Sequence, residues 1–195
     1  MVGVNLRPLL GVLIAACGLA AGCGSNQLVV MAELGAPVEL QCGEARFGLA
    51  RGQALAVFDG SWAAGTHLVA RVNGAVVEDL TLTQAQASQN LVWNVKGSCP
   101  VHAVDYTGCY GEDGKAAPGG TFHVLASLEG RSLYVPPPCQ LVNFTEPLPR
   151  ARIGVIPVVR LVRIPRDGMV GTLDDALHKE LDTQLDVHER LEFPR

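Results

Sequence analysis

The sequence predicts a mainly β protein, an antiparallel β-sandwich that ends in one α-helix. Short apolar or alternating segments recur from Leu28 to Val135, and turn residues such as Asn-Gly and Asp-Gly separate them. Short strands with frequent turn signals are typical of a sandwich. Near the C-terminus, leucines recur every four residues instead, which predicts a helix with one narrow apolar face.

The strongest strand signals lie in the first half of the chain. The segment 37–42 alternates apolar and polar residues, as a half-buried strand does. Asn73-Gly74 joins two alternating segments and is the clearest hairpin signal in the sequence. The predicted strands here are 28–32, 37–42, 53–58, 67–73, 75–82 and 90–95.

The second half is less regular. We expect a second hairpin from 121–128 and 132–135 around a turn at 129–131. Pro136-Pro-Pro-Cys139 predicts a stiff extended connector that leaves the sheet. The segment 153–164 is strongly β-forming, and because Pro157 cannot donate to a ladder we expect it at a sheet edge.

A helix is predicted over 172–191. Thr172 can cap it, and Asp174 and Asp175 follow near the positive end of the helix dipole. We expect the apolar stripe to pack on the sandwich, and the alternative is docking to an envelope partner protein or self-association. The stripe consists of Leu173, Leu177, Leu181 and Leu185.

The N-terminal residues have the pattern of a secretory signal. Arg7 supplies a positive charge, residues 8–22 carry no charge, and the chain turns polar after Cys23. A membrane span needs about 20 apolar residues, so this run is too short to cross a bilayer comfortably. We therefore expect residues 1–22 to be removed as a signal peptide.

The end of this signal resembles the lipobox of bacterial lipoprotein precursors. The segment reads Leu19-Ala-Ala-Gly-Cys23, with small residues before the cysteine. The resemblance implies that the Cys23 thiol is diacylated, that the signal is cut before it and that the new amino group is often acylated too. Ala20 stands where the family prefers Leu, Ile or Val. The rival match Ile14-Ala-Ala-Cys17 leaves Cys17 open as the lipidation site.

A lipid on Cys23 would hold the protein at a membrane, since two or more acyl chains anchor stably. Gly24 is not the aspartate that retains such proteins at the inner membrane. The resemblance therefore implies an outer-membrane location in a Gram-negative cell, on the periplasmic side or the surface. The expected organisation is a signal at 1–22, a lipidated tether at 23–27, a β-sandwich domain at 28–168 and a helix at 169–195.

A second, shorter resemblance concerns the sandwich. Asp113-Gly-Lys-Ala-Ala-Pro-Gly-Gly-Thr-Phe122-His-Val124 is similar to a segment of bacterial immunoglobulin-like modules. There a Pro-Gly corner leads into a strand whose aromatic residue plugs the core. The resemblance implies an immunoglobulin-like sandwich in which Phe122 is buried.

Four cysteines remain after Cys23, and an even number in an exported chain predicts two disulfides. Three pairings are possible, and we favour Cys99–Cys109 with Cys42–Cys139. A zinc site is the alternative, but no Cys-x-x-Cys or His-x-x-x-His pair is present. We expect no metal and no cofactor.

Composition and motifs point away from several functions. The net charge is −4, and no basic cluster favours nucleic acid. No catalytic motif is recognisable, so we expect a non-enzymatic envelope lipoprotein with a structural or protein-docking role. The alternative is a glycan-binding module of the cell envelope, which would use Trp62 and the aromatic loop that carries Tyr106 and Tyr110.

Overall fold

The computed structural model describes residues 26–115, 120–164 and 171–192, with side chains in the last segment as far as Thr183. Within these ranges the protein is mainly β and ends in one α-helix, which confirms the predicted class of fold. The predicted anchor Cys23, the alternative Cys17 and the signal segment 1–22 lie outside the described residues.

The strands form three four-stranded sheets. The first contains β1 (Asn26–Met31), β4 (Leu55–Gly60), β7 (Leu91–Asn94) and β10 (Leu133–Tyr134). The second contains β2 (Val38–Cys42), β3 (Ala45–Leu49), β5 (His67–Val72) and β6 (Ala75–Thr81). The third contains β8 (Val101–Asp105), β9 (His123–Ser127), β11 (Gln140–Val142) and β12 (Val158–Arg163).

The sheets differ in strand direction. The second sheet, in the order β3-β2-β5-β6, is antiparallel throughout. The first sheet, in the order β10-β7-β1-β4, has a parallel pair at its centre, β7 with β1. The third, in the order β11-β12-β8-β9, has a parallel pair at one edge, β11 with β12. Two of the sheets are therefore mixed rather than purely antiparallel.

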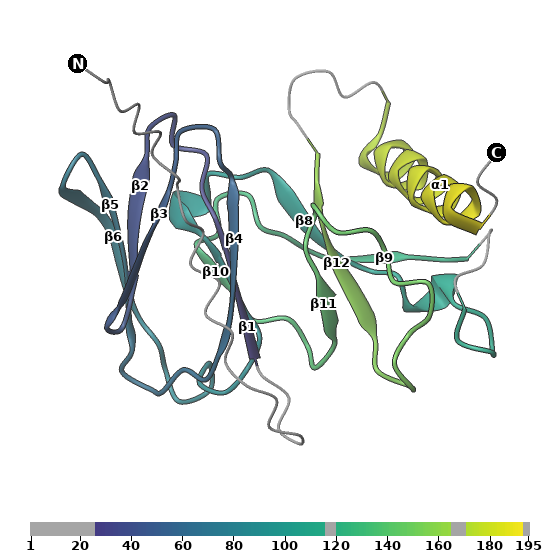
Figure 1. Ribbon diagram of the computed structural model, residues 1–195, viewed down its shortest axis with the longest axis horizontal. Helices are drawn as coiled ribbons and strands as arrows, with labels where there is room; N and C mark the ends of the chain where they lie inside the picture. Colours follow the sequence, from purple (N-terminus) through teal and green to yellow (C-terminus); the bar gives the residue numbers. More distant parts are fainter. Residues whose placement is uncertain (1–25, 116–119, 165–170, 193–195) are drawn as a thin grey trace, which may run out of the picture.

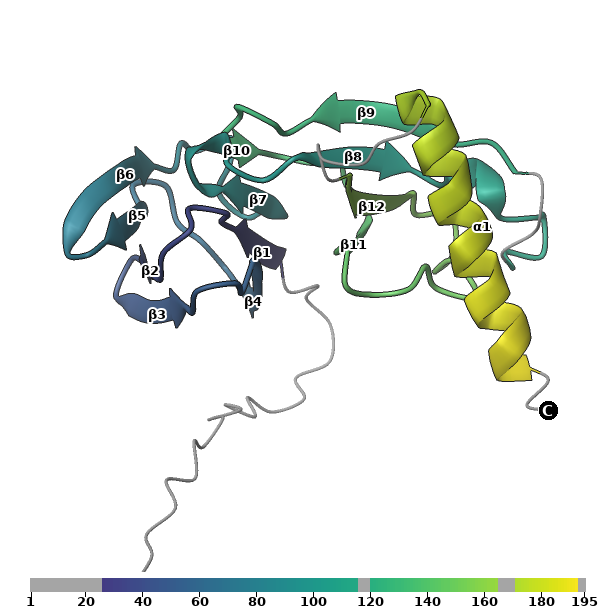
Figure 2. The same ribbon diagram turned by 90° about the horizontal axis from the view of Figure 1, so that it is seen from above.

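The sheets stack as layers in the order second, first, third, and helix α1 (Leu173–Glu192) covers the outer face of the third sheet (Figure 1 and Figure 2). Three separate apolar cores fill the spaces between these four layers. We call them the first, second and third core, beginning at the second sheet. The predicted two-sheet sandwich accounts for only the first of them.

Strand β1 shows why the first sheet can lie in the middle. Leu28 and Val30 belong to the first core, whereas Val29 and Met31 belong to the second. All four are at most 1% exposed. Successive side chains of a strand point to opposite faces, so an unbroken apolar run suits a strand covered on both sides.

The second sheet follows the sequence patterns closely. Asn73 and Gly74 both adopt positive φ, 52° and 79°, as a type I′ turn requires, and they connect β5 to β6 as predicted. Along β2, the side chains of Val38, Leu40 and Cys42 are buried in the first core, which confirms the alternation. Strand β3 was not predicted from the sequence.

Three interpretations of the second half are wrong. The segment directly before Tyr106, predicted as part of the aromatic loop, forms β8, which lies inside the third sheet between β12 and β9. Strands β9 and β10 form no hairpin, because β9 pairs with β8 and β10 pairs with β7 of another sheet. Strand β12 is not an edge strand. Pro157 precedes its first residue and uses only its carbonyl, which accepts from the Gln140 N–H at 2.8 Å.

The passage from the first sheet to the third depends on a glycine and an asparagine. Gly97 has a φ of +61°, and a Cβ there would lie 2.4 Å from the carbonyl carbon of Gly130. Asn94 is 1% exposed, and its amide donates to the carbonyls of Cys99 (3.0 Å) and Leu128 (2.8 Å). Its Oδ1 accepts from the Cys99 N–H at 2.9 Å. These bonds fix where the chain crosses between layers.

Helix α1 begins with the predicted cap. The Thr172 hydroxyl accepts from the Asp175 N–H at 3.1 Å, and the Asp175 carboxylate accepts from the Thr172 N–H at 2.8 Å. This reciprocal pair satisfies two backbone donors that a helix start leaves free. Leu177 and Leu181 are buried in the third core, and Leu173 packs at its margin. The described part of the leucine stripe therefore packs on the protein's own sheet, as expected; the side chain of Leu185 lies outside the described residues.

An ion pair also fastens the helix to the third sheet. The Arg160 side chain, on the central strand β12, is only 3% exposed and donates to the Glu180 carboxylate of α1. The same guanidinium donates to the carbonyls of Glu146 (3.1 and 3.2 Å) and Phe144 (3.4 Å). A buried charge needs such partners, so Arg160 links β12, the connector before it and the helix.

Candidate functional site

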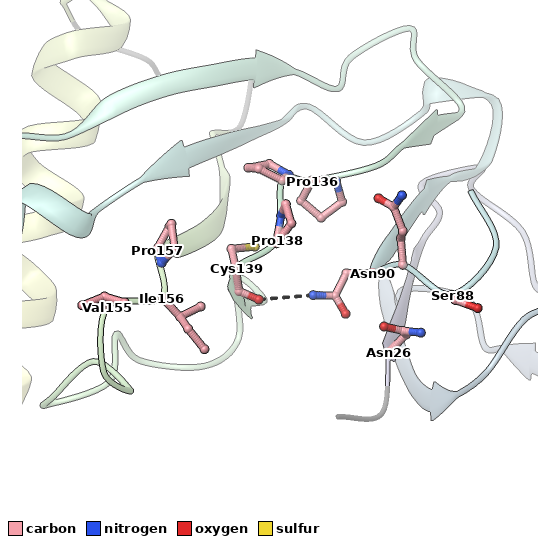
Figure 3. A pocket seen from close by; sticks show the side chains of 11 residues that line it. Asn26, Ser88, Asn90, Pro136, Pro138, Cys139, Val155, Ile156 and Pro157 are labelled. Carbon is pink, nitrogen blue, oxygen red and sulfur yellow. Dashed lines mark hydrogen bonds between the residues drawn. The ribbon is translucent and has the colours of Figure 1, made fainter. Parts of the chain in front are cut away.

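A hollow lies where the first and third sheets meet. Its volume is about 810 Å³. We call it the proline pocket, because the run Pro136–Pro138 forms one of its walls (Figure 3). The other walls come from the start of β1, the residues before β7 and the loop before β12. The lining residues are Asn26, Ser88, Gln89, Asn90, Pro136, Pro137, Pro138, Cys139, Val155, Ile156 and Pro157.

Asn90 holds two of these walls together. Its Oδ1 accepts from the backbone N–H of Gln27 at 2.9 Å, and its Nδ2 donates to the Cys139 carbonyl at 3.3 Å. The second of these bonds crosses the pocket in Figure 3. The start of β1 is thereby tied to the connector between β10 and β11. That connector is the predicted proline segment, and it does leave one sheet, since it carries the chain from the first sheet to the third.

The proline pocket is mostly apolar, and none of its described lining residues is charged. Cys139 contributes a thiol whose pKa is raised to about 11, mainly by burial and also by the nearby Asp105 carboxylate. At neutral pH this thiol is protonated, so it is a poor nucleophile and a poor metal ligand. The walls therefore suit an apolar or neutral group rather than an ion.

The loop before β12 adds an exposed aliphatic surface beside the pocket. Val155 is 86% exposed, Ile153 64% and Ile156 45%. Apolar side chains that gather on a surface mark contacts with proteins or membranes. The sequence pattern predicts a strand that includes this segment. The signal that it is a loop was available, because Gly154 and Pro157 interrupt the aliphatic run at its start.

Of the aromatic residues proposed for glycan binding, the two tyrosines are buried and Trp62 is half-buried. Tyr106 is 0% exposed and Tyr110 8%, and both belong to the third core. The Tyr110 hydroxyl donates to the Pro149 carbonyl at 2.8 Å. Trp62 packs against the first core, with its ring over Gly60. The sequence placed the tyrosines on a loop, but β8 and the turn after it carry them under helix α1, so they form no exposed aromatic platform.

The predicted disulfides are absent, since all four described cysteines are free thiols. Cys42 lies in the first core, Cys99 and Cys139 at the second, and Cys109 in the third. The first sheet separates Cys42 from Cys139, and the length of β8 separates Cys99 from Cys109. Burial raises the pKa of each thiol to about 11. These cysteines behave as small apolar core residues.

The described residues offer little support for a metal site. No group of three or more His, Cys, Asp or Glu side chains there is placed to hold a metal ion. Some half-buried polar groups are engaged in structural bonds. Glu78, for example, accepts from the Trp93 indole N–H at 2.8 Å and from the Lys96 N–H at 3.1 Å.

Comparisons with known proteins return no matching family model, no matching curated protein and no matching solved structure. Across the described segments, we also find no helix that is both long and apolar enough to cross a bilayer. A functional assignment therefore has to come from the residues themselves.

Proposed function

We propose that this protein is a bacterial envelope lipoprotein, anchored to a membrane through Cys23, with a non-enzymatic docking role. The N-terminal pattern carries the proposal: a basic start, an uncharged apolar run and Leu19-Ala-Ala-Gly-Cys23. Strand β1 begins at Asn26, only three residues after Cys23. The anchor would therefore hold the folded part close to the membrane, at the outer membrane if the cell is Gram-negative.

Intact mass and membrane fractionation test the anchor. The wild-type protein should be found in the membrane fraction, with a mass that corresponds to cleavage before Cys23 plus acyl chains. Cys23→Ala should lose both properties, and the matched control Cys17→Ala should keep them. If Cys17→Ala abolishes lipidation and Cys23→Ala does not, the anchor is at Cys17. An unlipidated wild-type protein would refute the proposal.

A docking role is supported by the way in which the interior polar groups are used. Asn94, Glu78 and Arg160 bond backbone or side-chain partners that hold the layers together. The outer face of helix α1 is open instead. Lys179 and Asp182 are exposed there, while Leu177 and Leu181 are buried in the third core. We therefore assign docking of an envelope protein to the polar face of the helix rather than to its leucine stripe.

Charge reversal on this face is a sharper test than deletion of the helix. Deletion would uncover Leu177 and Leu181 and so confuse unfolding with lost binding. Lys179→Glu with Asp182→Lys should leave the fold intact and release a partner that is chemically cross-linked to the wild type in cells. Retention of the same cross-link would remove the helix from the docking surface.

We further propose that the pair of sheets around the first core belongs to the immunoglobulin-like class of sandwich. The proposal is supported by two four-stranded sheets that face each other across one apolar core, with Trp93 fully buried in it. The third sheet would then be an addition to that module.

A further inference from the structure

The loop Ile153–Ile156 presents its aliphatic side chains to solvent in a fixed conformation. The Ile156 N–H donates to the Ile153 carbonyl at 3.2 Å, and Gly154 adopts a φ of +57° that permits this turn. Before the turn, the Arg152 N–H donates to the Gly114 carbonyl at 2.9 Å. After it, Pro157 is held by Gln140. Both ends of the loop are therefore hydrogen-bonded to other segments, and its aliphatic side chains are presented to solvent between them.

Val155 and Ile153 are the two most exposed large hydrophobic residues of the described part of the chain. Water is an unfavourable environment for such a pair of neighbours, so a surface of this kind is expected to be covered in the working protein. What covers it is indicated by its position and by its charge.

The position is next to the membrane anchor. Asn26 is the first residue of β1 and also lines the proline pocket, together with Val155 and Ile156 (Figure 3). An extended chain covers at most about 3.6 Å per residue, so the Cα of Cys23 lies within about 11 Å of the Cα of Asn26. A lipid on Cys23 therefore enters its bilayer beside this pocket. Strands β1 and β12 also begin toward the same lower end of the molecule in Figure 1.

The charge of the segment suits a lipid surface. Residues 147–157 contain the exposed Arg150 and the half-buried Arg152 and no acidic residue, and Glu146 directly precedes them. Exposed aliphatic side chains with a basic residue close before them suit a bilayer interface, where basic groups meet anionic headgroups.

We propose that Ile153, Val155 and Ile156 insert into the interfacial region of the bilayer that holds the Cys23 lipid. This inference rests on the proposed lipoprotein anchor and adds a second point of attachment. With two points, the protein has a fixed orientation on the membrane instead of swinging on its tether. The proline pocket then faces the bilayer surface.

Tryptophan depth measurements test the insertion in the full-length, lipidated protein. Val155→Trp places a reporter on the loop. Val76→Trp, at a position 54% exposed on β6 of the most distant sheet, is the matched control. Each protein is reconstituted into vesicles of phosphatidylethanolamine and phosphatidylglycerol, with or without brominated acyl chains, and the wild-type signal is subtracted. Ile153→Trp provides a second reporter if Val155→Trp folds poorly.

The loop tryptophan should shift its emission to shorter wavelength on vesicles and lose intensity with brominated lipid, because interfacial insertion reaches about 5–10 Å into the boundary between headgroups and acyl chains. The control tryptophan should do neither. If lipidation is confirmed by mass but the two reporters respond alike, the insertion is refuted and the anchor stands. If the mass shows no lipid on Cys23, the anchor is refuted and the insertion falls with it.

Discussion

The ion pair between Arg160 and Glu180 should control how firmly helix α1 is held. Arg160 is buried at the centre of the third sheet, with its side chain 3% exposed, whereas the Glu180 side chain is 31% exposed. Glu180→Ala would leave the guanidinium with carbonyl partners only, those of Phe144 and Glu146. A buried charge that loses its counter-charge is strongly destabilising.

The magnitude follows from this geometry. Breaking a fully buried pair costs about 3–5 kcal/mol, but water can enter on the Glu180 side, so we expect Glu180→Ala to cost about 2–3 kcal/mol. Arg160→Met leaves the two carbonyls without their donor, and we expect a cost of about 1–3 kcal/mol. Arg160→Met with Glu180→Ala removes both charges together. It should cost less than the sum of the single changes, by about 1 kcal/mol or more.

Urea unfolding measures these costs, in a chain that begins at Gly24 and so lacks the signal and Cys23. Far-ultraviolet circular dichroism follows the helix, and tryptophan fluorescence follows the first core, which contains Trp93. Coincident transitions would show that the layers unfold together. Lys179→Ala, an exposed neighbour on the helix, is the control and should change stability by less than about 0.5 kcal/mol. If Glu180→Ala changes the free energy of unfolding as little as this control, and the costs of the two single changes simply add in the double variant, the ion pair does not hold the helix.

Three further predictions concern the same Gly24 chain. Gly97→Ala should cost about 3 kcal/mol or more, because it adds a backbone clash to the cost of a left-handed residue. Gly35→Ala, which has a φ of +70° and no atom within 4 Å of the new Cβ, should cost only about 1–2 kcal/mol in urea unfolding. Alkylation without reductant should label four thiols in the unfolded chain. In the folded chain labelling should be slow, with Cys139 labelled first, and fewer than four labels by mass in the unfolded chain would show that a disulfide exists. Hydrogen bonds from Thr172 lower the pKa of Asp175, so its contribution to stability is present above pH 3.8 and is lost as the pH falls below that value. Acid should reduce the helical circular dichroism signal less in Asp175→Asn than in the wild type at the same pH. Equal losses in the two proteins would exclude a role for this carboxylate.

Local patterns determined the parts of the fold that depend on neighbouring residues. Asn73-Gly74 determined a hairpin, because the positive φ values it needs are intrinsic to those residue types. Thr172 and Asp175 determined where the helix begins, since their bonds span a single turn. The leucine spacing determined which face of the helix is buried, and the N-terminal pattern determined the expectation of a lipid anchor.

Only the tertiary structure decided how many layers there are and what lies between them. The run Leu28–Met31 reads as one strand, but its two faces belong to different cores, and a single sequence does not show what covers the second face. Cys42 and Cys139 lie on opposite sides of the first sheet, and the sequence alone does not show this either. The proline pocket joins residues from 26 to 157 in the chain, and long-range packing alone brings them together. Contacts between distant segments depend on how the sheets stack, which no local pattern encodes.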